Sequence, residues 1–130
     1  MKLITNEMAA LLMPAYQHSA ETGETSKPII AKFFTPWAGA TWYITEGWPL
    51  YNGEPIAEDR VDAIVDTSAY DWHLFGWCDL GDPGMAELGY VNLDQLKEIT
   101  GPGGLKIERD LHYTGVLSDV VPWMDKDEAA

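Results

Sequence analysis

The chain has 130 residues, of which 46% are hydrophobic, and its 8 Lys and Arg against 21 Asp and Glu give a net charge of −13. This length suits one domain with its own core, and this hydrophobic content excludes a disordered chain. A strongly negative charge argues against direct binding to nucleic acid phosphates or anionic membrane surfaces, and it favours basic partners.

The first predicted element is a short helix. Thr5 is suited to the N-cap, and Met8 and Leu12 follow at helical spacing. Pro14 is expected to stop this helix, and the polar residues 17–27 are expected to form a loop.

A β-hairpin is predicted next. Residues 29–34 and 41–46 are rich in aromatic and β-branched side chains, and the stretch 35–40 between them contains Pro and Gly. The signal weakens over about 47–71, which we interpret as an acidic insertion.

The second half alternates strands with one helix. Residues 72–78 and 88–91 are predicted strands, and 107–114 is the last strand candidate. Between them, Asn92 and Gln95 have the spacing of a capping box that starts a helix.

These elements predict one α+β domain over residues 1–130, with a small, mostly antiparallel sheet and two short helices. The acidic tail 122–130 is expected to fray. The order of the strands stays open.

Five sequence blocks follow the order of one known family along nearly the whole chain. They are residues 32–36, 41–42, 75–81, 87–93 and 104–112. Together they resemble the uncharacterised bacterial family called domain of unknown function 2958. The resemblance implies an association with plasmids and other mobile elements, and it supplies no catalytic residues. The chain departs from the family pattern between residues 46 and 71.

That departing segment is the most acidic part of the chain. It holds seven carboxylates against Arg60 alone, a balance of −6. Insertions lie on surfaces and often carry the specific function of a family member. A solvated acidic loop without any partner is the alternative. The predicted partner-binding residues are Glu54, Glu58, Asp59, Asp62 and Asp66, with Trp48 as an aromatic anchor.

Six tryptophans are many for this length. Trp42, Trp72 and Trp77 lie in predicted strands and are expected in the core, whereas Trp37, Trp48 and Trp123 fall in predicted turns or the tail. Exposed aromatics there could anchor a protein partner. Stacking on single-stranded bases would also need a basic groove, which dispersed Lys and Arg do not supply.

An alternative site lies on the last predicted strand. Glu108, Asp110 and His112 alternate, so their side chains would share one face, with Arg109 and Tyr90 as further members. Two carboxylates and an imidazole could support acid–base chemistry or bind a metal. Residues i and i+4 lie ~13 Å apart along a strand, so we expect no metal site and no cofactor.

Cys78 is the only cysteine, which excludes an internal disulfide and a multi-cysteine zinc site. His73 and Cys78 are five positions apart, so a strand would place them on opposite faces. Core packing is the expected role of Cys78. Pairing of Cys78 in space with His112 or His18 stays open.

These observations favour a binding protein over an enzyme. The expected partner is a basic host protein, such as a restriction or CRISPR effector, whose nucleic-acid groove the acidic chain would occupy by mimicking nucleic acid charge. The alternative is a small enzyme or ligand-binding domain that uses the Glu108–His112 strand. No membrane span or signal peptide is recognisable, so we expect a cytoplasmic protein.

Overall fold

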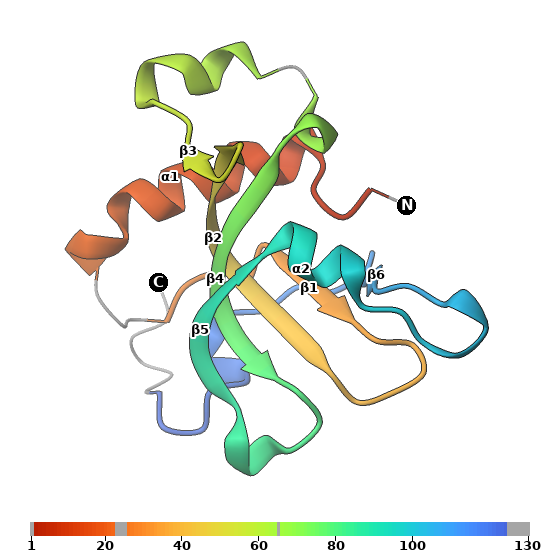
Figure 1. Ribbon diagram of the computed structural model, residues 1–130. Coiled ribbons are helices and arrows are strands. Elements are labelled where there is room, and N and C mark those ends of the chain that lie inside the picture. The colour runs from red at the N-terminus through yellow and green to blue at the C-terminus, as the bar shows by residue number, and fades with distance from the viewer. Residues whose placement is uncertain (1, 23–25, 65, 125–130) are drawn as a thin grey trace.

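An antiparallel sheet organises the chain in the computed structural model, which describes residues 2–22, 26–64 and 66–124 (Figure 1). Within these ranges the sheet has six strands in the order β5-β4-β2-β1-β6, with β3 paired to β2. The strands are β1 Ala31–Phe34, β2 Thr41–Tyr51, β3 Glu54–Pro55, β4 Asp71–Asp79, β5 Glu87–Asn92 and β6 Glu108–Arg109. The helices are α1 Asn6–Thr22 and α2 Leu93–Glu98, and 3₁₀ turns include η1 Glu58–Ala63, η2 Thr67–Ala69 and η5 Leu117–Asp119. The predicted α+β class is confirmed.

The larger core lies on one face of the sheet. Alternation along β4 turns Trp72 and Leu74 to this face, where both are fully buried. The helix α1 packs mainly on β2, and α2 packs on β4 and β5. Other buried members of this core are Leu3, Ile4, Leu12, Phe33, Trp42, Ile44, Leu93, Leu96 and Ile107.

A smaller core lies on the opposite face, around Trp77. Ile29 and three residues from the end of the described chain, Leu117, Val121 and Met124, bury it. Met124 is therefore buried in this core, although it belongs to the tail 122–130 that was expected to fray. Residues 125–130 of that tail lie outside the described residues.

The first helix is longer than the sequence predicted. Thr5 caps it as expected, because its Oγ1 accepts a hydrogen bond from Met8 N at 3.2 Å. Pro14, however, lies inside α1 and does not end it. Pro14 has no N–H, so the carbonyl of Ala10 lacks its helical hydrogen-bond donor. Both residues are exposed, so water can hydrogen-bond to that carbonyl instead.

The strand β2 also continues beyond its predicted end. It runs to Tyr51, so the predicted insertion 47–71 begins inside the sheet. A β-bulge between Ile44 and Glu46 shifts the register and lets β2 follow β4 as far as the pair Leu50 and Asp71.

The predicted strand 107–114 is wrong beyond its first residues. β6 comprises only Glu108 and Arg109, which pair with Phe34 and Phe33 at the edge of the sheet. The predicted loop 17–27 is wrong as far as Thr22, because α1 runs to that residue. The β1–β2 hairpin is antiparallel as predicted, and Gln95 Oε1 accepts from Asn92 N at 2.9 Å at the start of α2. Within the described ranges, no helix combines the length and the apolar character that a membrane crossing requires.

Candidate functional site

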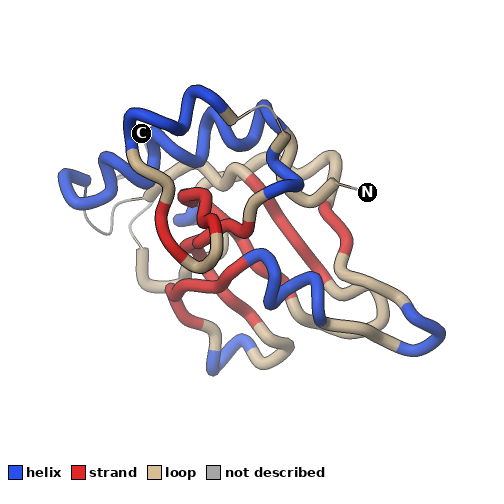
Figure 2. Tube along the Cα trace, turned by 45° about the horizontal axis from the view of Figure 1, so that its top comes forward, coloured by secondary structure: helices blue, strands red, loops and turns tan. Residues whose placement is uncertain are grey.

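Four of the five predicted partner-binding carboxylates lie on β3 and η1, at the top of the molecule in Figure 1, and the fifth, Asp66, precedes η2. Glu54, Glu58, Asp59 and Asp62 are all exposed, and together with the exposed Arg60 they belong to one short stretch of chain. We call these four acidic residues the β3–η1 surface. Figure 2 shows that η1 lies above the sheet next to α1.

Asp66 is exposed but engaged in local contacts. Its Oδ1 accepts from Ser68 N at 3.0 Å and from Ser68 Oγ at 2.6 Å, and Lys2 Nζ lies 3.4 Å away. These hydrogen bonds from Ser68, and then Lys2, lower the pKa of Asp66. Asp66 therefore caps η2 in addition to carrying charge.

Two carboxylates of the acidic segment have structural roles. Glu46 is only 3% exposed, and its Oε1 lies 3.5 Å from Lys27 Nζ. Asp71 Oδ1 accepts from Trp72 N at 2.7 Å and from Asp94 N at 2.9 Å, which ties β4 to α2. The −6 balance of the segment therefore overstates the charge that a partner can meet.

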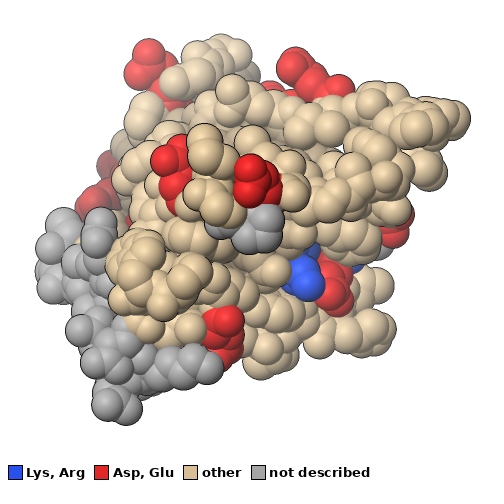
Figure 3. Space-filling view, turned by 90° about the horizontal axis from the view of Figure 1, so that it is seen from below, with Lys and Arg blue, Asp and Glu red and all other residues tan. Residues whose placement is uncertain are grey.

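Charge is distributed differently at the opposite end of the molecule. Seen from below, Asp and Glu form separate small groups among uncharged residues, and Lys and Arg are visible at essentially one place (Figure 3). Among the described residues visible on that face, the acidic side chains form no continuous surface.

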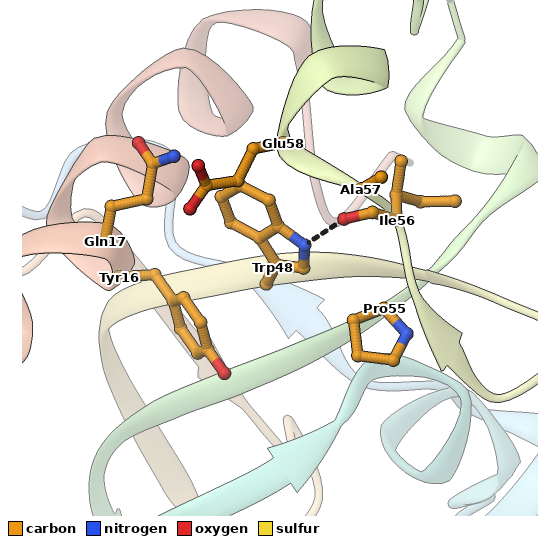
Figure 4. Close-up of a pocket in the computed structure, with 7 residues that line it drawn as sticks. All are labelled: Tyr16, Gln17, Trp48, Pro55, Ile56, Ala57 and Glu58. Atoms are coloured by element: carbon orange, nitrogen blue, oxygen red, sulfur yellow. Dashed lines mark hydrogen bonds between the residues drawn. The ribbon is translucent and has the colours of Figure 1, made fainter.

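A pocket of about 460 Å³ adjoins the β3–η1 surface (Figure 4). Tyr16 and Gln17 of α1, Trp48 of β2 and residues 55–58 line it. The predicted exposed anchor Trp48 is wrong, because Trp48 lies in a strand and is 5% exposed. Its Nε1 donates to Ile56 O at 2.8 Å, so the indole holds β3 and η1 against β2.

A second hollow of about 460 Å³ lies along the same stretch of chain. Residues 55–57 line both hollows, while Tyr51, Glu54, Asp59 and Arg60 line only this one. The stretch 55–59 therefore stands between two depressions, with carboxylates beside each.

A row of rings extends from the first pocket across the sheet. Tyr16 lies 5.7 Å from Trp48 and 6.4 Å from His73, and His73 stacks on Tyr90 at 4.6 Å, all between ring centroids. Burial, followed by the charges of Glu46 and Tyr16, raises the pKa of Tyr90. Trp48 and Tyr90 of this row were among the predicted site residues, and Tyr16 and His73 were not.

His73 has a fixed position in this row, because its Nδ1 lies 2.9 Å from Asn92 Oδ1. His73 pairs with Asn92 across β4 and β5, and Trp48 pairs with His73 across β2 and β4. The strand alternation already indicated that His73 shares a face with Phe75, but the sequence contained no signal for which strand lay beside β4.

The alternative site residues do not come together. Tyr90 lies on β5 and Glu108 and Arg109 lie on β6, at opposite edges of the sheet. Asp110 and His112 follow β6, so the predicted alternation of three side chains on one strand face is absent. Among the described residues, no three His, Cys, Asp or Glu side chains are arranged to hold a metal ion.

The members of that predicted site have other contacts. Arg109 Nη1 donates to Met8 Sδ at 3.2 Å across to α1. Asp110 Oδ1 accepts from His112 N at 3.0 Å, and its Oδ2 lies 3.7 Å from Lys32 Nζ. His112 is exposed. These contacts join β6 to β1 and α1.

Cys78 should react slowly with thiol reagents in the folded protein. Burial, and then the charge of Glu87, raises the pKa of Cys78 to about 11. A raised pKa leaves less thiolate at any lower pH, so at pH 8 we expect a disulfide reagent to label Cys78 roughly 10²-fold more slowly than an ordinary cysteine. The labelling rate should rise about tenfold per pH unit up to pH 10. The same chain unfolded in urea is the control. Fast, pH-independent labelling of the folded protein would contradict the raised pKa of Cys78.

The family comparison covers the second half of the chain. The sequence model of a family described as "Protein of unknown function (DUF2958)" matches residues 63–130. This match includes β4, β5 and β6 but not the predicted blocks at 32–36 and 41–42, so it is shorter than the resemblance implied. The four acidic residues of the β3–η1 surface precede it. The chain matches no curated protein and no solved structure.

Proposed function

Because the chain belongs to the DUF2958 family, whose function is unknown, we propose from its geometry that it is a protein-binding module for a basic partner. The observation that carries this proposal is the exposed β3–η1 surface, Glu54, Glu58, Asp59 and Asp62, which stands beside two hollows. Charge brings a basic partner to this surface, and the hollows offer it places to insert side chains.

The positions of the acids support binding rather than a purely structural role. Glu46, Asp66 and Asp71 each stabilise the fold through a named contact. The four acids of the β3–η1 surface, in contrast, project from a 3₁₀ turn and a two-residue strand into solvent. Like charges so close together repel one another, and a basic partner would relieve that repulsion.

The finer proposal concerns the identity of the partner. A protein with a positively charged nucleic-acid groove has the charge that complements the β3–η1 surface, and the overall charge of −13 would steer its approach. In this proposal the chain competes with nucleic acid for the groove of a host defence protein in the cytoplasm. Added duplex DNA should then displace the chain.

Neutralising the β3–η1 surface should abolish capture of basic proteins. The variant Glu54→Gln, Glu58→Gln, Asp59→Asn, Asp62→Asn removes four negative charges without shortening any side chain. We expect nuclease-treated cell lysate to yield a basic nucleic-acid-handling protein on the immobilised wild type, released at moderate salt, and none on the variant. Mass spectrometry of the salt-gradient fractions measures this.

A second variant, which loses the same number of negative charges as the first, provides the control. Asp82→Asn, Glu87→Gln, Asp94→Asn, Glu98→Gln neutralises four exposed acids on the β4–β5 connection, β5 and α2. It should still capture the partner, because its β3–η1 surface is intact. Equal loss in both variants would assign binding to net charge alone, and unchanged capture by the first variant would refute the proposed surface.

A further inference from the structure

The pocket beside η1 combines one carboxylate with aromatic and apolar walls. Figure 4 shows Glu58 at one end, with its carboxylate turned toward Gln17 and the Trp48 ring. Tyr16 forms the wall from α1, and Pro55 and Ile56 form the opposite side. The volume of about 460 Å³ falls within the range of ligand pockets, about 300–1,000 Å³, and suffices for a single long side chain.

The walls are held in place by contacts of their own. The Trp48 indole N–H already donates a hydrogen bond to Ile56 O, so Trp48 can offer a ligand only its π system. Tyr16 is half-buried and its ring lies 5.7 Å from that of Trp48, with an interplanar angle of 31°. The pocket is thus preformed, and a ligand would not have to order it.

These features select a cation with flat, weakly hydrated faces. A guanidinium stacks on aromatic rings and forms paired hydrogen bonds to a carboxylate, whereas an ammonium is more strongly hydrated and binds as a point charge. No Lys or Arg of the described chain lines this pocket, and Arg60 lines the neighbouring hollow. No cation of the described chain therefore lines the pocket beside Glu58, and a cation from a partner can bind its carboxylate there.

We propose that this pocket receives one arginine side chain of the partner, with the guanidinium stacked on Tyr16 and hydrogen-bonded to the Glu58 carboxylate. This inference rests on the proposed function and adds to it the residue that the partner contributes.

The test uses three peptides, acetyl-Gly-Arg-Gly-amide and its lysine and citrulline counterparts, titrated into the full ¹⁵N-labelled chain. Citrulline keeps the shape of arginine without its charge. The assigned indole N–H signal of Trp48 reports binding, and that of Trp72, which is fully buried and donates to Thr67 O, is the internal reference. We expect a saturable shift of the Trp48 signal with the arginine peptide, a weaker response with lysine and none with citrulline.

Substitutions distinguish the pocket from the general charge of the surface. Glu58→Gln should weaken binding of the arginine peptide about tenfold, since it removes the charged partner of the guanidinium. Tyr16→Leu should weaken it about threefold through lost stacking. Asp62→Asn removes the same charge from η1 without touching the pocket, and it should change the affinity less than twofold.

Equal shifts with arginine and citrulline, or equal effects of Glu58→Gln and Asp62→Asn, would overturn the arginine pocket. The proposed function would still stand in that case if the β3–η1 variant lost its partner and the charge-matched control kept it. Failure of that lysate experiment together with a Glu58-dependent arginine shift would leave the pocket in place and refute the surface.

Discussion

Gly76→Ala should destabilise the protein by about 3 kcal/mol, the upper part of the usual range for overpacking. A methyl group at this position would overlap the backbone carbonyl of Tyr43 and crowd the Cα of Ile44. The cause is the bulge in β2 directly after Ile44, which brings that backbone close over β4. Backbone atoms cannot rotate away as a flexible side chain could, so one of the two central strands must shift.

Gly89→Ala is the matched control for this prediction. Gly89 pairs with Gly76 across β4 and β5, and a methyl group at Gly89 would meet nothing within 4 Å. We expect Gly89→Ala to change the stability by less than about 0.5 kcal/mol. Thermal unfolding should show a loss of roughly 10 °C for Gly76→Ala alone. Equal midpoints for the two variants would show that β2 does not approach β4 in this way.

Lys27→Met should destabilise the protein by about 3 kcal/mol, because it leaves the buried carboxylate of Glu46 without its cation. Both side chains are largely buried, so water replaces the lost partner poorly. Lys27 precedes β1 and Glu46 follows the bulge of β2, so their ion pair fixes the start of the sheet against its central strand.

A double-mutant cycle measures this ion pair. Lys27→Met with Glu46→Leu replaces both charges by apolar groups and should return the free energy of unfolding to within about 1 kcal/mol of the wild type. Urea denaturation of the two single variants and the double variant gives the coupling energy. A loss below about 1 kcal/mol for Lys27→Met would mean that Glu46 has another way to be solvated.

Local patterns predicted the paired strands well. The alternation in β1 and β4, the β1–β2 hairpin and the spacing of Asn92 and Gln95 each depend on neighbours in sequence, and the structure confirms them. The buried positions of Trp42, Trp72 and Trp77 follow from the same alternation.

Local patterns failed where packing between distant segments decided the outcome. Pro14 reads as a helix end, yet Tyr16 beyond it packs on Trp48 and α1 continues. The strand was predicted to end at residue 46, yet Pro49 is buried in β2 opposite Trp72, and its carbonyl accepts from Ile56 N. The candidate pocket lies where the part of α1 beyond Pro14 meets the part of β2 beyond residue 46. Neither part was predicted, so the sequence contained no indication of the pocket.

By itself, the sequence determined the α+β class, the acidic charge, the exposed carboxylates of residues 54–62 and the membership of the chain in its family. These properties depend on composition, on periodicity or on matching of local blocks. Only the tertiary structure decided that Glu46 is buried beside Lys27, that Trp48 holds β3 and η1, and that Tyr90 and Glu108 lie at opposite edges. Strand order and the bulge set these positions, and both arise from contacts between residues far apart in the chain, for which one sequence has no local signal.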